Sequence, residues 1–170
     1  MSGRTSITGR KAGRRAGWAL AVALCLPPEA VHADPFLGRL ECVSLQVNVL
    51  ESGESFGVTP EMLRDSLRSG LKQLAPALKL DPACPDRLLY SVFLQELSTD
   101  TFRGFYGHLT LEVKRSAVFR ETALLGSAQA WDLESYIHGP REQAKTGVVD
   151  HLRRHLAQFA EDYRAANRKE

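Results

Sequence analysis

Residues 40–50, Leu-Glu-Cys-Val-Ser-Leu-Gln-Val-Asn-Val-Leu, decide the fold because apolar and polar side chains alternate along them. The apolar side chains of every second residue from Val43 to Val49 fall on one face of an extended chain, and polar side chains such as Gln46 fall on the other. This period of two, carried mostly by valines, is typical of a strand with one buried face. We therefore expect a half-buried strand over residues 40–50.

A helix is predicted after a short polar loop at residues 51–55. Thr59 is a good N-cap, Pro60 is favoured at the first helical position, and the carboxylate of Glu61 complements the positive end of the helix dipole. One apolar stripe follows with the spacing of a helix face, formed by Leu63, Leu67, Leu71 and Leu74. Pro76 ends this helix, and a loop with three prolines is expected over residues 76–86.

Three further strands and one long helix complete the predicted fold. The strands are expected at residues 88–97, 105–119 and 122–131, and the helix at 141–166, where apolar residues recur with helical spacing. The predicted order is β-α-β-β-β-α. We expect a two-layer α+β domain whose four-stranded, mainly antiparallel sheet carries both helices on one face.

The first 33 residues have the pattern of a secretory signal peptide. A basic start precedes an apolar run of 11 residues at 16–26, and Val31-His32-Ala33 offers a small-residue cleavage site. A membrane-spanning helix needs about 20 apolar residues, so we expect no stable transmembrane segment after cleavage. The sequence predicts an exported protein, periplasmic or extracellular, with a signal peptide at 1–33 and a single domain at 34–170.

Other interpretations of the leader stay open. It could be retained as an anchor, or Cys25 could carry a lipid, although the preceding Leu24 is larger than the residue that lipid attachment normally requires. Arg14-Arg15 resembles a twin-arginine signal, but the residues that follow fit that pattern poorly. General secretion is the interpretation that we follow.

Cleavage would change the charge and the cysteine content of the chain. Five of the 22 basic and one of the 20 acidic residues lie in the leader, which leaves 17 and 19. Such an evenly mixed chain does not favour a nucleic-acid partner, which requires clustered Lys and Arg. Cys42 and Cys84 remain, and in an oxidising compartment they favour a disulfide, with two buried thiols as the alternative.

Element order and a few local stretches resemble small exported domains of the bacterial cell envelope. The stretches are the Val43–Val49 strand, the Leu63–Leu74 helix, Ala130-Trp131 at a strand end, and the closing run Phe159–Asn167. Together they are similar to the amino-terminal domain of the TolB type and to transport-auxiliary domains, over residues 40–167. The resemblance implies a binding or assembly module rather than an enzyme, and it transfers no site residue.

No catalytic signature stands out in the sequence. His151 and His155 have the spacing of two ligands on one helix face, but Arg153 and Arg154 lie between them, and a solvated face is the simpler interpretation. Residues 53–57, Gly-Glu-Ser-Phe-Gly, fit the letters of a nucleophile elbow but not its strand–turn–helix context. We expect no metal and no cofactor. The alternative function is a small exported hydrolase that uses His108 or His138 with a carboxylate in a pocket.

Two segments predicted to link secondary-structure elements are the candidate binding surfaces. Residues 102–108 and 131–138 combine aromatic side chains with polar ones, as interface anchors do. The leading hypothesis is an exported envelope module that binds an envelope protein or a small apolar ligand, and a third hypothesis is an assembly subunit that shares strands at its sheet edge. The predicted contact residues are Phe102, Arg103, Phe105, Tyr106, Trp131 and Tyr136.

Overall fold

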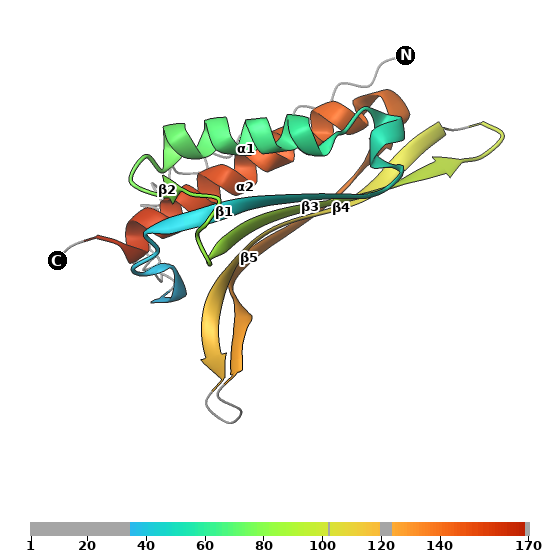
Figure 1. Ribbon diagram of the computed structural model, residues 1–170. Helices are drawn as coiled ribbons and strands as arrows, with labels where there is room; N and C mark the ends of the chain where they lie inside the picture. Colours follow the sequence, from blue (N-terminus) through green and yellow to red (C-terminus); the bar gives the residue numbers. More distant parts are fainter. Residues whose placement is uncertain (1–34, 102, 120–123, 169–170) are drawn as a thin grey trace, which may run out of the picture. The chain divides into compact units, whose positions relative to one another are not determined.

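The computed structural model describes residues 35–168 except 102 and 120–123, and within them a sheet is covered by two helices on one face (Figure 1). The strand order is β2-β1-β3-β4-β5. The strands are β1 (Cys42–Glu51), β2 (Lys79–Leu80), β3 (Arg87–Ser98), β4 (Arg103–Phe119) and β5 (Leu124–Pro140). The helices are α1 (Pro60–Leu74) and α2 (Ala144–Ala166), and the short 3-10 helices are η1 (Pro35–Leu37), η2 (Ser52–Phe56) and η3 (Arg141–Gln143).

Helix α1 connects two parallel strands. It begins as predicted, with Pro60 in its first turn and the Thr59 hydroxyl accepting a hydrogen bond from the Met62 amide at 3.3 Å. The helix carries the chain back so that β3 runs in the same direction as β1, with Val47 opposite Tyr90. Strands β4 and β5 then follow as antiparallel neighbours of β3.

The core lies between the sheet and the helices. Every second residue of β3 from Leu88 to Leu94 is buried there, as are the predicted leucines of α1 except the half-buried Leu74. Helix α2 adds a second buried stripe, because its apolar residues recur every three or four positions. The largest α2 residues in this stripe are Leu152, Leu156, Phe159 and Tyr163.

The predicted four-stranded, mainly antiparallel sheet is wrong, because the sheet has five strands and is mixed. The additional strand, β2, has only two residues and lies within the proline-rich segment that was expected to be a loop. Backbone hydrogen bonds hold it against β1, from the Lys79 amide to the Glu41 carbonyl (3.1 Å) and from the Asp81 amide to the Val43 carbonyl (3.0 Å). Such bonds leave no side-chain pattern in the sequence.

The last strand is longer than predicted. Strand β5 continues to Pro140 instead of ending at residue 131, and β4 begins at Arg103. The two segments expected to be links are therefore largely strand. Trp131 and Ile137 are buried while Asp132 and Tyr136 are exposed, so the alternation of a half-buried strand continues through this region.

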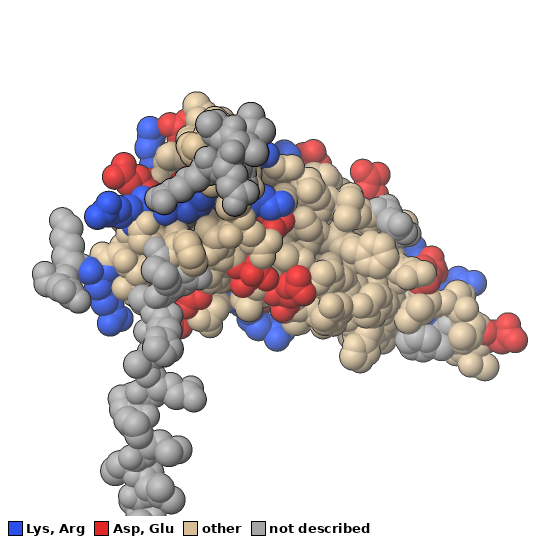
Figure 2. Space-filling model, turned by 90° about the horizontal axis from the view of Figure 1, so that it is seen from below, with Lys and Arg blue, Asp and Glu red and all other residues tan. Residues whose placement is uncertain are grey.

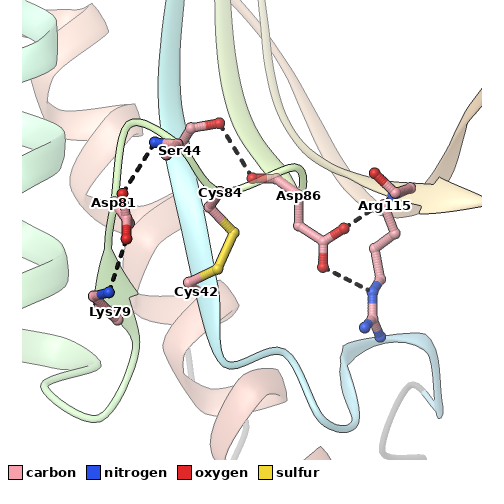
Figure 3. Close-up of a disulfide and its surroundings, with 9 residues drawn as sticks. Cys42, Ser44, Lys79, Asp81, Cys84, Asp86 and Arg115 are labelled. Carbon is pink, nitrogen blue, oxygen red and sulfur yellow. Dashed lines mark hydrogen bonds and ion pairs between the residues drawn. A yellow bond between two sulfur atoms is a disulfide. The ribbon is translucent and has the colours of Figure 1, made fainter.

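A disulfide between Cys42 and Cys84 confirms the predicted pairing, with a distance of 6.1 Å between the two Cα atoms (Figure 3). It fastens the start of β1 to the loop between β2 and β3. The same loop is held to β4 by Asp86, whose carboxylate accepts hydrogen bonds from the Arg115 guanidinium (3.3 Å) and the Ser116 amide (2.9 Å). The loop between β2 and β3 is thus attached to both β1 and β4 at this end of the sheet.

The predicted signal peptide at 1–33 lies outside the described residues. Among the described residues, no helix is both long and apolar enough to cross a membrane.

Candidate binding surface

The face of the sheet opposite the helices carries an aromatic patch. Because both helices lie on one side (Figure 1), side chains on the other side of the pleat lie on a face that neither helix covers. The strand register places Leu50 beside Phe93, Phe93 beside His108, and His108 beside Tyr136. We define the aromatic patch as the open-face residues Leu50, Phe93, Leu97, Tyr106, His108 and Tyr136.

Several members of the aromatic patch are far more exposed than large apolar residues usually are. Tyr136 is 62% exposed, Leu50 50%, Leu97 43% and Tyr106 36%. They come from four different strands, so the patch is contiguous across the sheet only because the fold brings these strands together. Figure 2, which views the molecule from below, shows a broad area of uncharged residues on this side.

The rings in the patch are stacked on one another. The centroids of His108 and Tyr136 are 4.8 Å apart with 17° between the ring planes, and those of Tyr106 and Tyr136 are 6.1 Å apart with 23°. Side chains stand roughly perpendicular to a sheet, so rings stacked in this way turn their faces toward each other and their edges outward. The patch therefore presents ring edges and phenol hydroxyls to a partner.

The same face becomes polar and then charged away from the patch. Asn48, Ser91 and Thr110 lie opposite one another in the next row, and Thr110 pairs with Glu134 on β5. Beyond them Glu112 lies directly opposite Asp132, and the Glu112 carboxylate is 3.2 Å from the Lys114 ammonium. One end of the open face is thus apolar and the other is mixed in charge.

The predicted contact residues separate into two groups. Tyr106 and Tyr136 lie together in the aromatic patch, whereas Phe105 (3% exposed) and Trp131 (7% exposed) are buried on the helix face of the sheet. Arg103 is exposed at the start of β4, and Phe102 lies outside the described residues. The separation follows from the strand, since adjacent residues point to opposite faces.

Leu50, Phe93 and Leu97 are surface residues that were not predicted from the sequence. Phe93 lies in the nearly continuous apolar run 88–94, which favours a strand covered on both faces. The parity of residues along each strand was a usable signal, because Phe93 and Leu97 share one parity whereas Tyr90, Val92 and Leu94, which are buried under the helices, share the other.

The histidines proposed for hydrolysis lie outside the four main hollows lined by the described residues. His108 Nε2 is 3.4 Å from a carboxylate oxygen of Glu134, so a histidine–carboxylate pair exists, but this nitrogen is covered. His138 is exposed on β5. The described residues line hollows of about 450, 290, 700 and 510 Å³, and neither histidine lines any of these four.

The other histidine pair is divided between core and surface. His155 is 2% exposed and its Nε2 lies 2.7 Å from the Ser135 hydroxyl, whereas His151 is only half-buried. Burial, together with the nearby His151 and Arg154, lowers the pKa of His155 to about 4. In the part of the chain that the structure describes, no three His, Cys, Asp or Glu side chains are grouped as a metal ion requires.

Comparison with known proteins gives distant matches in structure alone. No protein-family model and no curated protein matches the chain. The chain is similar to a dodecamer of a PelC variant from Paraburkholderia phytofirmans, with 11% identity and a TM-score of 0.39 over 78% of this chain and 90% of that chain. It is also similar to a minor lipoprotein from Acinetobacter baumannii, with 12% identity and a TM-score of 0.33 over 76% and 92%. Neither is described as a TolB-type domain, and similarities at these TM-scores support no conclusion about the function of this chain.

Proposed function

We propose that this protein is an exported module of the cell envelope that binds a protein partner on its aromatic patch. The observation that carries the proposal is the open face of the sheet. The exposed fractions of Tyr106 and Tyr136 add up to about one whole tyrosine side chain, or about 200 Å² of surface. The exposed Leu50 and Leu97 enlarge this area, and contiguous apolar patches of a few hundred Å² or more mark interaction sites.

The shape of the patch supports a protein partner over a small apolar ligand. Small ligands are usually held in concave sites that enclose most of their surface, and the aromatic patch lies on the open face of a sheet. Exposed tyrosines are common anchors of protein interfaces, where the ring supplies apolar area and the hydroxyl a hydrogen bond. The outward ring edges of Tyr106 and Tyr136 suit this use.

The leader and the disulfide support the proposed location. Residues 1–33 have the order of regions found in a secretory signal. The disulfide between Cys42 and Cys84 is the kind of bond that persists in an oxidising compartment. A partner in the same compartment is therefore an envelope protein.

Quantitative affinity capture tests the proposal. The tagged chain is recovered from the envelope fraction of its native cell, its first residue is sequenced, and its co-purifying proteins are compared with those of the double variant Tyr106→Ser/Tyr136→Ser. We expect a mature chain that begins at Asp34 and a partner whose recovery falls at least tenfold in the variant, because the anchors of the interface are removed.

A matched control uses the other exposed apolar pair of the chain. Val118 (65% exposed) and Leu125 (76% exposed) lie opposite each other where β4 and β5 extend past the bulge at Val113/Lys114. The variant Val118→Ser/Leu125→Ser removes a similar apolar area outside the patch and is expected to retain the partner. Equal recovery with all three proteins, or loss only with the control variant, would contradict the proposal.

A further inference from the structure

We infer that the outer edge of β5, over residues 132–136, accepts an extended peptide as an additional strand. The side chains of this peptide on the open face would be basic opposite Asp132 and Glu134, and aromatic or apolar opposite Tyr136. This inference rests on the proposed function, because the added strand would extend the open face on which the aromatic patch lies.

Strand β5 has a long edge without a described partner. It stands last in the sheet order and pairs with β4 on one side, and among residues 35–168 that the structure describes no strand pairs with its other side. Every second residue of such a strand points its backbone N–H and C=O outward. These groups form a ready template for another strand.

The sequence of β5 lacks the lysines and internal prolines that commonly protect an edge. Lysines, prolines or an early end normally prevent an exposed strand from pairing with other chains. Strand β5 runs for 17 residues without Lys or Arg, and its only proline, Pro140, is its last residue. The opposite edge of the sheet differs, since β2 covers the start of β1 at Cys42 and Val43.

The charges along β5 select the chemistry of the partner. Asp132 and Glu134 are both exposed on the open face, two positions apart. Asp132 lies directly opposite Glu112, and among the residues that the structure describes it forms no ion pair. A Lys or Arg on an added strand would supply the missing opposite charge at cross-strand distance.

The same charges disfavour pairing with a second copy of this chain in the register centred on Leu133. An antiparallel β5–β5 pairing centred on Leu133 would place Asp132 of each copy opposite Glu134 of the other, and like charges directly opposite are destabilising. A basic peptide meets no such repulsion. In a peptide antiparallel to β5, every second side chain lies on the open face. From its N-terminus to its C-terminus, the peptide would therefore place an aromatic residue opposite Tyr136, a basic residue opposite Glu134 and a second basic residue opposite Asp132.

Peptide binding tests the inference on the purified full chain. The probe is a fluorescein-labelled peptide, Thr-Val-Tyr-Val-Lys-Val-Lys-Val-Thr, and fluorescence anisotropy at low salt measures its dissociation constant. We expect binding that weakens at least tenfold for a peptide with Glu in place of both Lys and for a peptide N-methylated throughout, which cannot form the backbone hydrogen bonds. Bound peptide should also slow amide hydrogen exchange in β5.

Charge reversal gives the matching variant of the protein. In Asp132→Lys/Glu134→Lys we expect at least tenfold weaker binding of the Lys peptide and a preference for the Glu peptide. Glu161 is an exposed acid on α2 rather than on β5, so Glu161→Lys controls for net charge and is expected to bind as the unchanged protein does.

Three results would overturn the inference. The first is equal binding of the Lys and Glu peptides, and the second is equal binding of the N-methylated and unmodified Lys peptides. The third is self-association of the protein, measured by sedimentation, that is lost in Asp132→Lys/Glu134→Lys, because a second copy would then be the occupant of the edge. Each of them leaves the capture experiment intact, because that experiment depends on Tyr106 and Tyr136. The proposed function and the peptide site therefore fail separately.

Discussion

At the scale of single residues, His155 makes the stability of the protein sensitive to acid. Its pKa is lowered to about 4 in the folded chain, whereas an unfolded histidine titrates near 6.5. The unfolded chain therefore binds a proton first as the pH falls, and the free energy of unfolding declines between pH 6.5 and 4, by up to about 3 kcal/mol. Above this range the stability is unaffected by this group.

Urea unfolding at pH 7.5 and pH 4.5 checks this prediction. The double variant His155→Leu/Ser135→Ala replaces both partners of the 2.7 Å contact, so that neither is left as an unsatisfied polar group. We expect the variant to lose less stability than the unchanged protein between the two pH values. An identical loss in both proteins would assign the acid sensitivity to other groups.

Gly107 is a residue at which the fold has no room for a side chain. A Cβ atom there would lie 2.6 Å from a Leu94 methyl carbon and 3.0 Å from both an Ile137 side-chain carbon and the Phe93 carbonyl oxygen. We expect Gly107→Ala to lower the free energy of unfolding by about 1–3 kcal/mol through overpacking, measured by urea unfolding.

Gly147 is the matched control for this change. A Cβ at Gly147 would meet side chains only at 3.9 Å, an ordinary contact, and the position lies in α2, where Ala is the better helix former. Gly147→Ala is expected to leave stability unchanged or to raise it by up to about 1 kcal/mol. If both variants behave alike, the close packing around Gly107 is not limiting.

At the scale of elements, the disulfide joins segments that the sheet holds only weakly. Strand β2 has two residues, and Cys84 lies in the loop that follows it. Cross-linking residues 42 positions apart restricts the unfolded chain by about 4 kcal/mol in the loop-entropy account.

Removing the bridge should therefore reduce the stability by a similar amount. We expect Cys42→Ser/Cys84→Ser to unfold at a lower urea concentration, with a loss of about 4 kcal/mol, and the unchanged protein to show the same loss after reduction. A reduced protein that keeps its full stability would show that the surrounding hydrogen bonds of Asp86 suffice.

The elements that the sequence predicted are those with local signals. The cap at Thr59 and Pro60, the stripe of α1 and the alternation of β1 are each visible within a few residues, and the structure has all three. Strand β2 and the parallel pairing of β1 with β3 depend on backbone bonds between distant segments, which no local pattern records. The disulfide was predictable because only two cysteines follow the leader.

At the scale of the whole described domain, the candidate surface depends on which face the helices cover. The sequence suggested Tyr106 and Tyr136 by their composition, but it grouped them with Phe105 and Trp131, which are buried. Residue parity assigns each side chain to a face, yet only the packed helices determine which face is open. The row from Leu50 to Tyr136 then follows from the register of four strands.

The position of α2 after every strand of the sheet has a consequence for the order of events during synthesis. This helix supplies about a quarter of the buried apolar residues of the core, and residues such as Leu152 and Phe159 leave the ribosome after the whole sheet. A growing chain therefore cannot fully shield the apolar side of β4 and β5 from water until α2 has been synthesised.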